Sequence, residues 1–202
     1  MHHRAFDTRL LEARLAELPH VLQVAYALLI VERLYPALAA YSRETAGDEA
    51  RRLRERLDET WDGLEKGTLS AARLRDISDE VYELRPETED NPSPISSYAL
   101  DAAAAAWEAI QSAITRDVSH VAAAAQIAFE SVYMHQEERE GFAPQDRADQ
   151  AAILVREPVA RELEAQEFQW RRAKALSQAP QAGVSTLRRE FGRPDHSIHG
   201  LS

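Results

Sequence analysis

The sequence predicts an all-α fold, a compact single-domain array of about nine or ten helices. Apolar residues recur with the 3.6-residue period of an α-helix nearly everywhere, and the two-residue alternation of a β-strand is almost absent. Only 7 glycines and 9 prolines occur among 202 residues, which leaves little room for long linkers. With 45% hydrophobic and 29% charged residues, the chain has a globular composition and is long enough to bury roughly 70% of its unfolded-state surface.

Prolines separate the first helices. A helix is expected over residues 7–18, and Pro19 opens a second one because proline fits the first helical position. Apolar residues cover most of the circumference of this second helix, which predicts a buried central helix. Pro36 disfavours helical geometry in the preceding residue and has no N–H to donate, so the second helix is predicted to end near Tyr35. Pro36 then starts a short third helix through Thr45.

Capping residues place the next two helices. Asp48 is predicted to cap a helix over residues 49–66, which Gly67 ends. Ser70 caps a further helix that runs to Leu84. The apolar stripe of the first of these two helices consists of Leu53, Leu57, Trp61 and Leu64.

A proline-rich loop lies near the middle of the chain. Residues 85–96 contain Asn91-Pro92-Ser93-Pro94, the strongest turn signal in the sequence. Because neither half has an obviously complete core, residues 1–202 are predicted to form one all-helical domain. Residues 194–202 either belong to it or form a flexible tail.

Two alanine-rich helices are expected at the centre. Ser96 or Ser97 caps a helix to about Thr115, and Asp117 caps another to Glu140. Small side chains allow two helices to approach closely, so this pair is predicted to form a close antiparallel hairpin. The alanine runs are Ala102–Ala106 and Ala122–Ala125.

The C-terminal part is predicted to be helical as well. Pro144 opens a helix, and Pro158 either kinks it or starts another that runs to Gln178. A last short helix is expected over residues 186–191 and is ended by Gly192.

Composition restricts the partners and the location. The formal net charge is −10, whereas a nucleic-acid binder needs clustered positive charge, so neither nucleic acid nor an anionic membrane surface is expected as a partner. The chain has no cysteine, which excludes disulfides and a cysteine nucleophile. The N-terminus lacks the apolar run of a signal peptide, and no stretch approaches the ~20 apolar residues of a membrane span. A cytoplasmic location is therefore expected.

No motif specifies a reaction. A di-metal carboxylate bundle needs two Glu-x-x-His pairs that face inward, and proline breaks the helical register of Glu17-Leu18-Pro19-His20. No glycine-rich phosphate loop and no nucleophile elbow is present. We therefore expect no catalytic residue, no metal and no cofactor. Whether the chain is an enzyme stays open, with a non-enzymatic role favoured.

Four polar residues form a candidate pocket. Glu32, Arg33 and Tyr35 lie at the end of the apolar second helix, and Asp101 lies in the first turn of the first alanine-rich helix. A partly buried charged pair beside a carboxylate is typical of ligand sites. The alternative is structural, because Arg33 and Asp101 each suit the charge of their helix end and Glu32 can pair across a helix crossing. We favour the structural interpretation.

Charge is unevenly distributed along the chain, which could steer a basic partner or a second copy of the chain. The alternative is that both charged runs are solvated helix faces. The acidic run consists of Asp76, Asp79, Glu80, Glu83, Glu87, Glu89 and Asp90. The basic run consists of Arg171, Arg172, Lys174, Arg188, Arg189 and Arg193.

Several short segments carry a resemblance that covers nearly the whole chain. They are Glu32-Arg33-Leu34-Tyr35-Pro36 with Tyr41, Trp61, Tyr98-Ala99-Leu100-Asp101-Ala102, Glu130-Ser131-Val132, Glu167-Phe168-Gln169-Trp170, Leu187-Arg188 and Ser197-Ile198. Together they resemble the YjaG-like bacterial family, known as domain of unknown function 416. The sequence departs from that family at Ala37 and Leu38, where an Asn-Tyr pair often follows the proline. The resemblance implies an all-helical fold and self-association, and it carries over no catalytic residue.

Two classes of function follow. The first is a non-enzymatic helical protein that acts by protein–protein interaction and is expected to be a homodimer; a variant is an immunity- or antitoxin-type protein whose acidic run covers a basic toxin. The second is an enzyme or small-ligand binder with a polar pocket around Glu32, Arg33, Tyr35 and Asp101.

Overall fold

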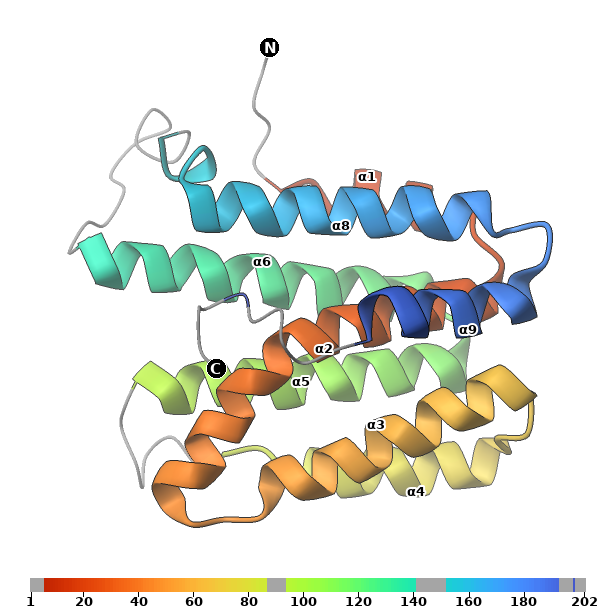
Figure 1. Ribbon diagram of the computed structural model, residues 1–202, viewed down its shortest axis with the longest axis horizontal. Coiled ribbons are helices and arrows are strands. Elements are labelled where there is room, and N and C mark those ends of the chain that lie inside the picture. Colours follow the sequence, from red (N-terminus) through yellow and green to blue (C-terminus); the bar gives the residue numbers. More distant parts are fainter. Residues whose placement is uncertain (1–5, 87–93, 141–151, 193–197, 199–202) are drawn as a thin grey trace.

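The structure is a computed structural model that describes residues 6–86, 94–140, 152–192 and 198. Within these ranges every regular element is a helix, so the predicted all-α fold is confirmed (Figure 1). The helices are α1 (Thr8–Leu15), α2 (His20–Thr45), α3 (Glu49–Lys66), α4 (Ala71–Tyr82), α5 (Pro94–Thr115), α6 (Val118–Glu140), α8 (Glu157–Ala175) and α9 (Pro180–Phe191).

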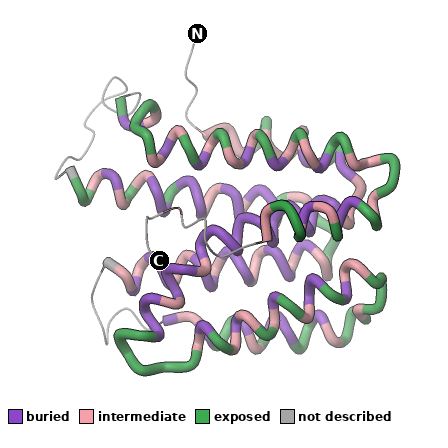
Figure 2. The backbone as a smooth tube through the Cα atoms, in the orientation of Figure 1, coloured by how far each residue is buried: buried purple, intermediate pink, exposed green. Residues whose placement is uncertain are grey.

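Helix α2 lies at the centre of the array. It contacts α3, α5, α6, α8 and α9, most extensively α5, and nearly all of its length is buried (Figure 2). By length and composition alone, α2 is also long and apolar enough to cross a membrane. The expectation that no stretch of the chain approaches a membrane span was therefore wrong. However, 89% of its most apolar window is buried inside the protein. This is the position of a core helix.

The predicted break at Pro36 is wrong. Helix α2 continues through Pro36 to Thr45 and ends at Ala46, which has a left-handed φ of 53°. A proline inside a helix costs about 3 kcal/mol or more. The neighbouring Leu34 and Leu38 are fully buried, and burial of such side chains contributes about 1.5–3 kcal/mol each. Packing therefore outweighs the local preference of the proline.

The predicted caps are confirmed only in part: Asp48 makes no side-chain capping hydrogen bond at the start of α3, whereas Ser70 caps α4. The Asp7 carboxylate accepts a hydrogen bond from the Leu10 N–H at 3.1 Å, which starts α1. The Ser70 hydroxyl accepts from the Arg73 N–H at 3.1 Å and starts α4. Gly67 ends α3 with a φ of 64°, as its position predicted.

The alanine-rich hairpin is confirmed. Helices α5 and α6 run antiparallel beside each other, and α2 packs against both (Figure 1). Helix α5 begins at Pro94 and not at Ser96 or Ser97, because proline itself serves as a first helical residue. The alanines with no exposed surface are Ala99, Ala102, Ala103, Ala105, Ala106 and Ala109 of α5 and Ala122, Ala124, Ala125 and Ala128 of α6.

The structure settles where the two C-terminal helices begin. Pro158 occupies the first turn of α8 and therefore starts that helix. Helix α9 begins at Pro180, not near residue 186. Gly183 lies inside α9 because a Cβ there would stand 3.1 Å from Leu22 Cδ2, so this glycine serves close packing. The helix predicted to open at Pro144 lies largely outside the described residues.

Candidate functional site

Helix α8 buries a polar stripe against the centre of the fold. Glu162, Gln166 and Gln169 recur at helical spacing and are 2%, 5% and 4% exposed. Buried polar groups need hydrogen-bond partners, so such a stripe requires a matching surface on its neighbours. The sequence does not predict this stripe, because three polar residues at this spacing are equally typical of a solvated helix face.

Arg33 of α2 supplies the main partner. Its guanidinium donates to both Glu162 oxygens, with Nε–Oε2 at 3.0 Å and Nη2–Oε1 at 2.6 Å. It also donates to the Leu29 carbonyl oxygen at 3.2 Å and to the Gln169 side-chain oxygen. The two charged side chains are only 7% and 1% exposed, which makes this a buried, bidentate ion pair.

Gln166 extends the polar contact to α6. Its Nε2 donates to the Ala125 carbonyl oxygen at 3.0 Å and to Glu162 Oε1 at 2.9 Å. The stripe therefore ties α8 to both α2 and α6. We call Arg33, Glu162, Gln166 and Gln169 the polar seam.

A cavity of about 310 Å³ opens beside the polar seam, between α1, α2 and α8. Tyr26 of α2 lines it and is fully buried, and its hydroxyl has no hydrogen-bond partner among the described residues. Burial raises the pKa of Tyr26, so the phenol stays neutral. The lining consists of Phe6, Asp7, Leu10, Leu11, Arg14, Tyr26, Leu163, Gln166, Glu167 and Trp170.

An ion pair and an indole form one wall of this cavity. Arg14 Nη2 lies 2.6 Å from Glu167 Oε2, and the guanidinium carbon lies 4.0 Å from the centre of the Trp170 ring. The Trp170 indole N–H donates to the Arg14 carbonyl oxygen at 3.1 Å. Glu167 also accepts from Arg171 at 2.7 Å. The charges of this wall are therefore paired within the protein.

Two of the four predicted pocket residues face α3. Glu32 is 1% exposed and accepts from Arg54 at 2.6 and 2.8 Å and from the Trp61 indole N–H at 3.0 Å. The Arg54 guanidinium carbon lies 5.4 Å from the centre of the Tyr35 ring. The Tyr35 hydroxyl donates to the Ala50 carbonyl oxygen at 3.0 Å. Glu32 and Tyr35 thus join α2 to α3.

Asp101 faces a third neighbour, α6. It hydrogen-bonds Ser131, but burial outweighs this bond and raises the pKa of Asp101 to about 6, with the charge of Glu130 acting in the same direction. The predicted pocket residues therefore point to three different helices: Glu32 and Tyr35 to α3, Arg33 to α8, and Asp101 to α6. Within the described ranges, no cluster of three or more histidine, aspartate or glutamate side chains could hold a metal ion.

Four residues of the basic run, Arg171, Arg172, Lys174 and Arg188, form ion pairs within the chain. Arg172 binds Glu190 and Lys174 binds Glu17, with N–O distances of 2.7 and 2.9 Å. Arg188 lies 2.6 Å from Asp62 of α3. Arg193 lies outside the described residues.

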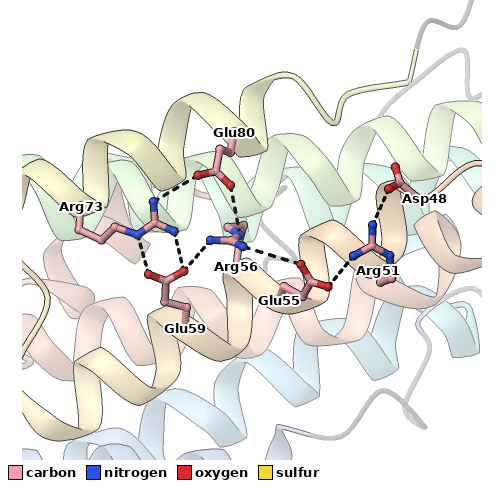
Figure 3. A network of polar contacts seen from close by, with 7 residues as sticks. All are labelled: Asp48, Arg51, Glu55, Arg56, Glu59, Arg73 and Glu80. Atoms are coloured by element: carbon pink, nitrogen blue, oxygen red, sulfur yellow. Dashed lines mark hydrogen bonds and ion pairs between the residues drawn. The ribbon is translucent and has the colours of Figure 1, made fainter.

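The acidic run is only partly neutralised. Glu80 joins a network that also contains Arg56 and Arg73 (Figure 3), and Asp76 lies 3.9 Å from Arg73. Asp79 and Glu83 are exposed on or next to α4. Glu87, Glu89 and Asp90 lie outside the described residues.

Comparisons with known proteins agree on one family. The model of a family described as "Protein of unknown function (DUF416)" matches residues 11–202. The fold is also similar to the crystal structure of a DUF416 family protein from Shewanella baltica OS155, with a TM-score of 0.83 at 18% identity over 95% of this chain and 97% of that one. No curated protein matches the chain.

Proposed function

The chain belongs to the DUF416 family, and on that premise we propose that it is a non-enzymatic, cytoplasmic protein that acts by protein–protein interaction, as a homodimer. The engagement of its buried charges supports a non-enzymatic role. Glu32 and Arg33 each bind a partner on a neighbouring helix. Groups held in this way serve the architecture and are not poised to act on a substrate.

One exposed aromatic pair carries the proposal of self-association. Phe168 of α8 is 59% exposed, and its ring meets Phe191 of α9 edge to face, with centroids 5.7 Å apart. Arg172 and Glu190 form an ion pair between the same two helices. An aromatic centre beside a charged rim is the usual composition of an interface hot spot.

A two-fold arrangement suits this surface. In an isologous dimer the same patch of each copy meets its counterpart, so each Phe168 would pack against the Phe168–Phe191 pair of the other copy. The Arg172–Glu190 pairs would then lie at the rim, where they exclude water and fix the orientation.

Light scattering coupled to size-exclusion chromatography tests the proposal. The wild-type chain of 22.7 kDa is expected to elute with twice that mass at micromolar concentration. Phe168→Glu is expected to elute as a monomer, because it places two charges at the two-fold axis. Tyr82→Glu is the matched control, since Tyr82 is a similarly exposed aromatic residue, 53% exposed, on α4. A monomeric wild type, or a Phe168→Glu variant that stays dimeric, contradicts the proposal.

A second candidate function rests on α4. Tyr82 is exposed next to Asp79 and Glu83, and the Arg85 guanidinium carbon lies 3.3 Å from the centre of its ring. An aromatic residue among carboxylates suits a basic protein partner, as in an immunity- or antitoxin-type protein. A toxin gene beside the gene for this chain would support this candidate. Loss of binding to that toxin in Tyr82→Glu, but not in Phe168→Glu, would place the contact on α4.

A further inference from the structure

We propose that the cavity between α1, α2 and α8 binds a small, uncharged, mainly apolar molecule that carries one oxygen able to accept a hydrogen bond from Tyr26. This site differs from the predicted pocket, none of whose residues lines the cavity; that pocket comprised Glu32, Arg33, Tyr35 and Asp101. It is also independent of the proposed self-association, because Phe168 does not line the cavity.

The size and walls of the cavity suit a small molecule. Its volume of about 310 Å³ lies at the lower end of the range typical of ligand pockets, roughly 300–1,000 Å³. Most of its wall is apolar, as in ligand pockets generally. The apolar lining residues are Phe6, Leu10, Leu11, Leu163 and Trp170.

The Tyr26 hydroxyl supplies the specific contact. A fully buried hydroxyl almost always has a hydrogen-bond partner, and Tyr26 has none among the described residues. The nearby polar side chains are already engaged: Gln166 donates to Ala125 and Glu162, and Glu167 accepts from Arg14. The hydroxyl has almost no accessible surface in this structure, so a ligand oxygen would have to displace lining side chains slightly in order to accept the phenol hydrogen.

The charges around the cavity favour an uncharged ligand. Arg14 is paired with Glu167, and the Asp7 carboxylate caps the N-terminus of α1. Farther in, Arg33 is paired with Glu162. A charged ligand would lose part of its hydration without finding a free counter-charge, which costs free energy. A neutral ketone, ether or ester oxygen needs only the one donor that Tyr26 offers.

Two matched probes test the proposal. Acetophenone has an apolar ring and one carbonyl oxygen, and in α-methylstyrene a CH₂ group replaces that oxygen. We expect both to shift the indole N–H signal of Trp170 in NMR titrations of the wild-type protein. Acetophenone should bind roughly two- to tenfold more tightly, the range expected for one neutral hydrogen bond.

Two variants assign the binding to this cavity. Tyr26→Phe removes only the hydroxyl and is expected to bind the two probes with equal affinity. Leu163→Trp fills the cavity and should abolish binding of both, with circular dichroism confirming that it folds. If Leu163→Trp fails to fold, the comparison of Tyr26→Phe with wild type decides alone, because that variant only removes an unpartnered hydroxyl.

Several results would overturn the proposal. The first is that neither probe shows saturable binding to the wild type, or that the probes bind without shifting the Trp170 signal. The second is that Tyr26→Phe keeps the preference for acetophenone. Phe168→Glu is expected to bind both probes as the wild type does, so loss of the dimer and loss of the ligand site are separate outcomes.

Discussion

Two regions of this protein use the same chemistry in different surroundings. In the polar seam, Arg33 and Glu162 lie 2.6 Å apart with side chains 7% and 1% exposed. Between α3 and α4, Arg73 and Glu59 lie equally close at 2.6 Å, but their side chains are 33% and 34% exposed (Figure 3). Both pairs are bidentate arginine–carboxylate contacts of similar length that differ strongly in burial, so a comparison between them reports mainly on the effect of solvent.

That difference sets what each pair contributes. Exposed pairs are screened by water and salt, and each contributes about 0–1 kcal/mol. A buried pair costs much to desolvate, and removal of one partner leaves an unpaired charge in the interior, which costs about 3–5 kcal/mol. The seam therefore holds α8 in register on α2, whereas the network between α3 and α4 adds many small contributions.

The largest expected effect follows from breaking the seam. Arg33→Met leaves the buried Glu162 carboxylate without its counter-charge, with the Gln166 amide as its remaining donor, and leaves the Gln169 amide oxygen without the Arg33 donor. We expect the free energy of unfolding to fall by about 3–5 kcal/mol. Urea denaturation followed by circular dichroism measures this change. A loss below about 1 kcal/mol would show that the pair behaves like a surface pair.

Asp101 is expected to have an effect of intermediate size. It is a half-buried carboxylate, and no cationic group is among those that shift its pKa. Burial raises its pKa in the folded state from the ordinary 3.8 to about 6, so the folded protein holds this proton more tightly than the unfolded chain. The unfolding free energy should therefore fall as pH rises through this window. Asp101→Asn is expected to be more stable than wild type at pH 7 by up to about 3 kcal/mol.

The pH dependence distinguishes this cause from a change in packing. The advantage of Asp101→Asn should shrink as pH falls from about 6 and vanish below about 4, where both the folded and unfolded wild type are protonated at Asp101. Urea denaturation at a series of pH values measures it. An advantage that stays constant with pH would attribute the effect to packing.

The smallest expected effect belongs to the exposed network. Arg73→Met removes contacts with Glu59 and Glu80 and should lower the unfolding free energy by about 1 kcal/mol or less. The same substitution type as Arg33→Met makes the two variants directly comparable. Most of the loss should disappear in 1 M salt, because the groups are screened there. A loss that salt leaves unchanged would mean that Arg73 acts through packing of its aliphatic stem.

The contrast between these regions also explains what the sequence could predict. The apolar stripe of α3 and the cap at Ser70 act locally, and the structure confirms them. The break at Pro36 was wrong because the decisive contacts come from helices distant in sequence. A local sequence preference fails to predict the structure where packing against distant helices contributes more free energy than that preference.

The sequence predicts that Arg33 has a buried partner but does not identify which residue that partner is. An arginine in an apolar central helix must have a partner, since buried charges are nearly always paired. The sequence contains 34 aspartates and glutamates, and nothing local distinguishes Glu162 from the others. The segment Glu167–Trp170 carries part of the family resemblance. That its Gln169 lies beside Arg33 depends on how α8 crosses α2, which no local pattern specifies.

The central claim is that the buried charges of this protein hold helices together, and a double-mutant cycle tests it most directly. Arg33→Met and Glu162→Met are each expected to lose several kcal/mol of unfolding free energy. The double variant should lose less than the sum of the two, with a coupling of about 1–3 kcal/mol, because it leaves no unpaired charge. Additive losses, with no coupling between the two positions, would contradict the claim.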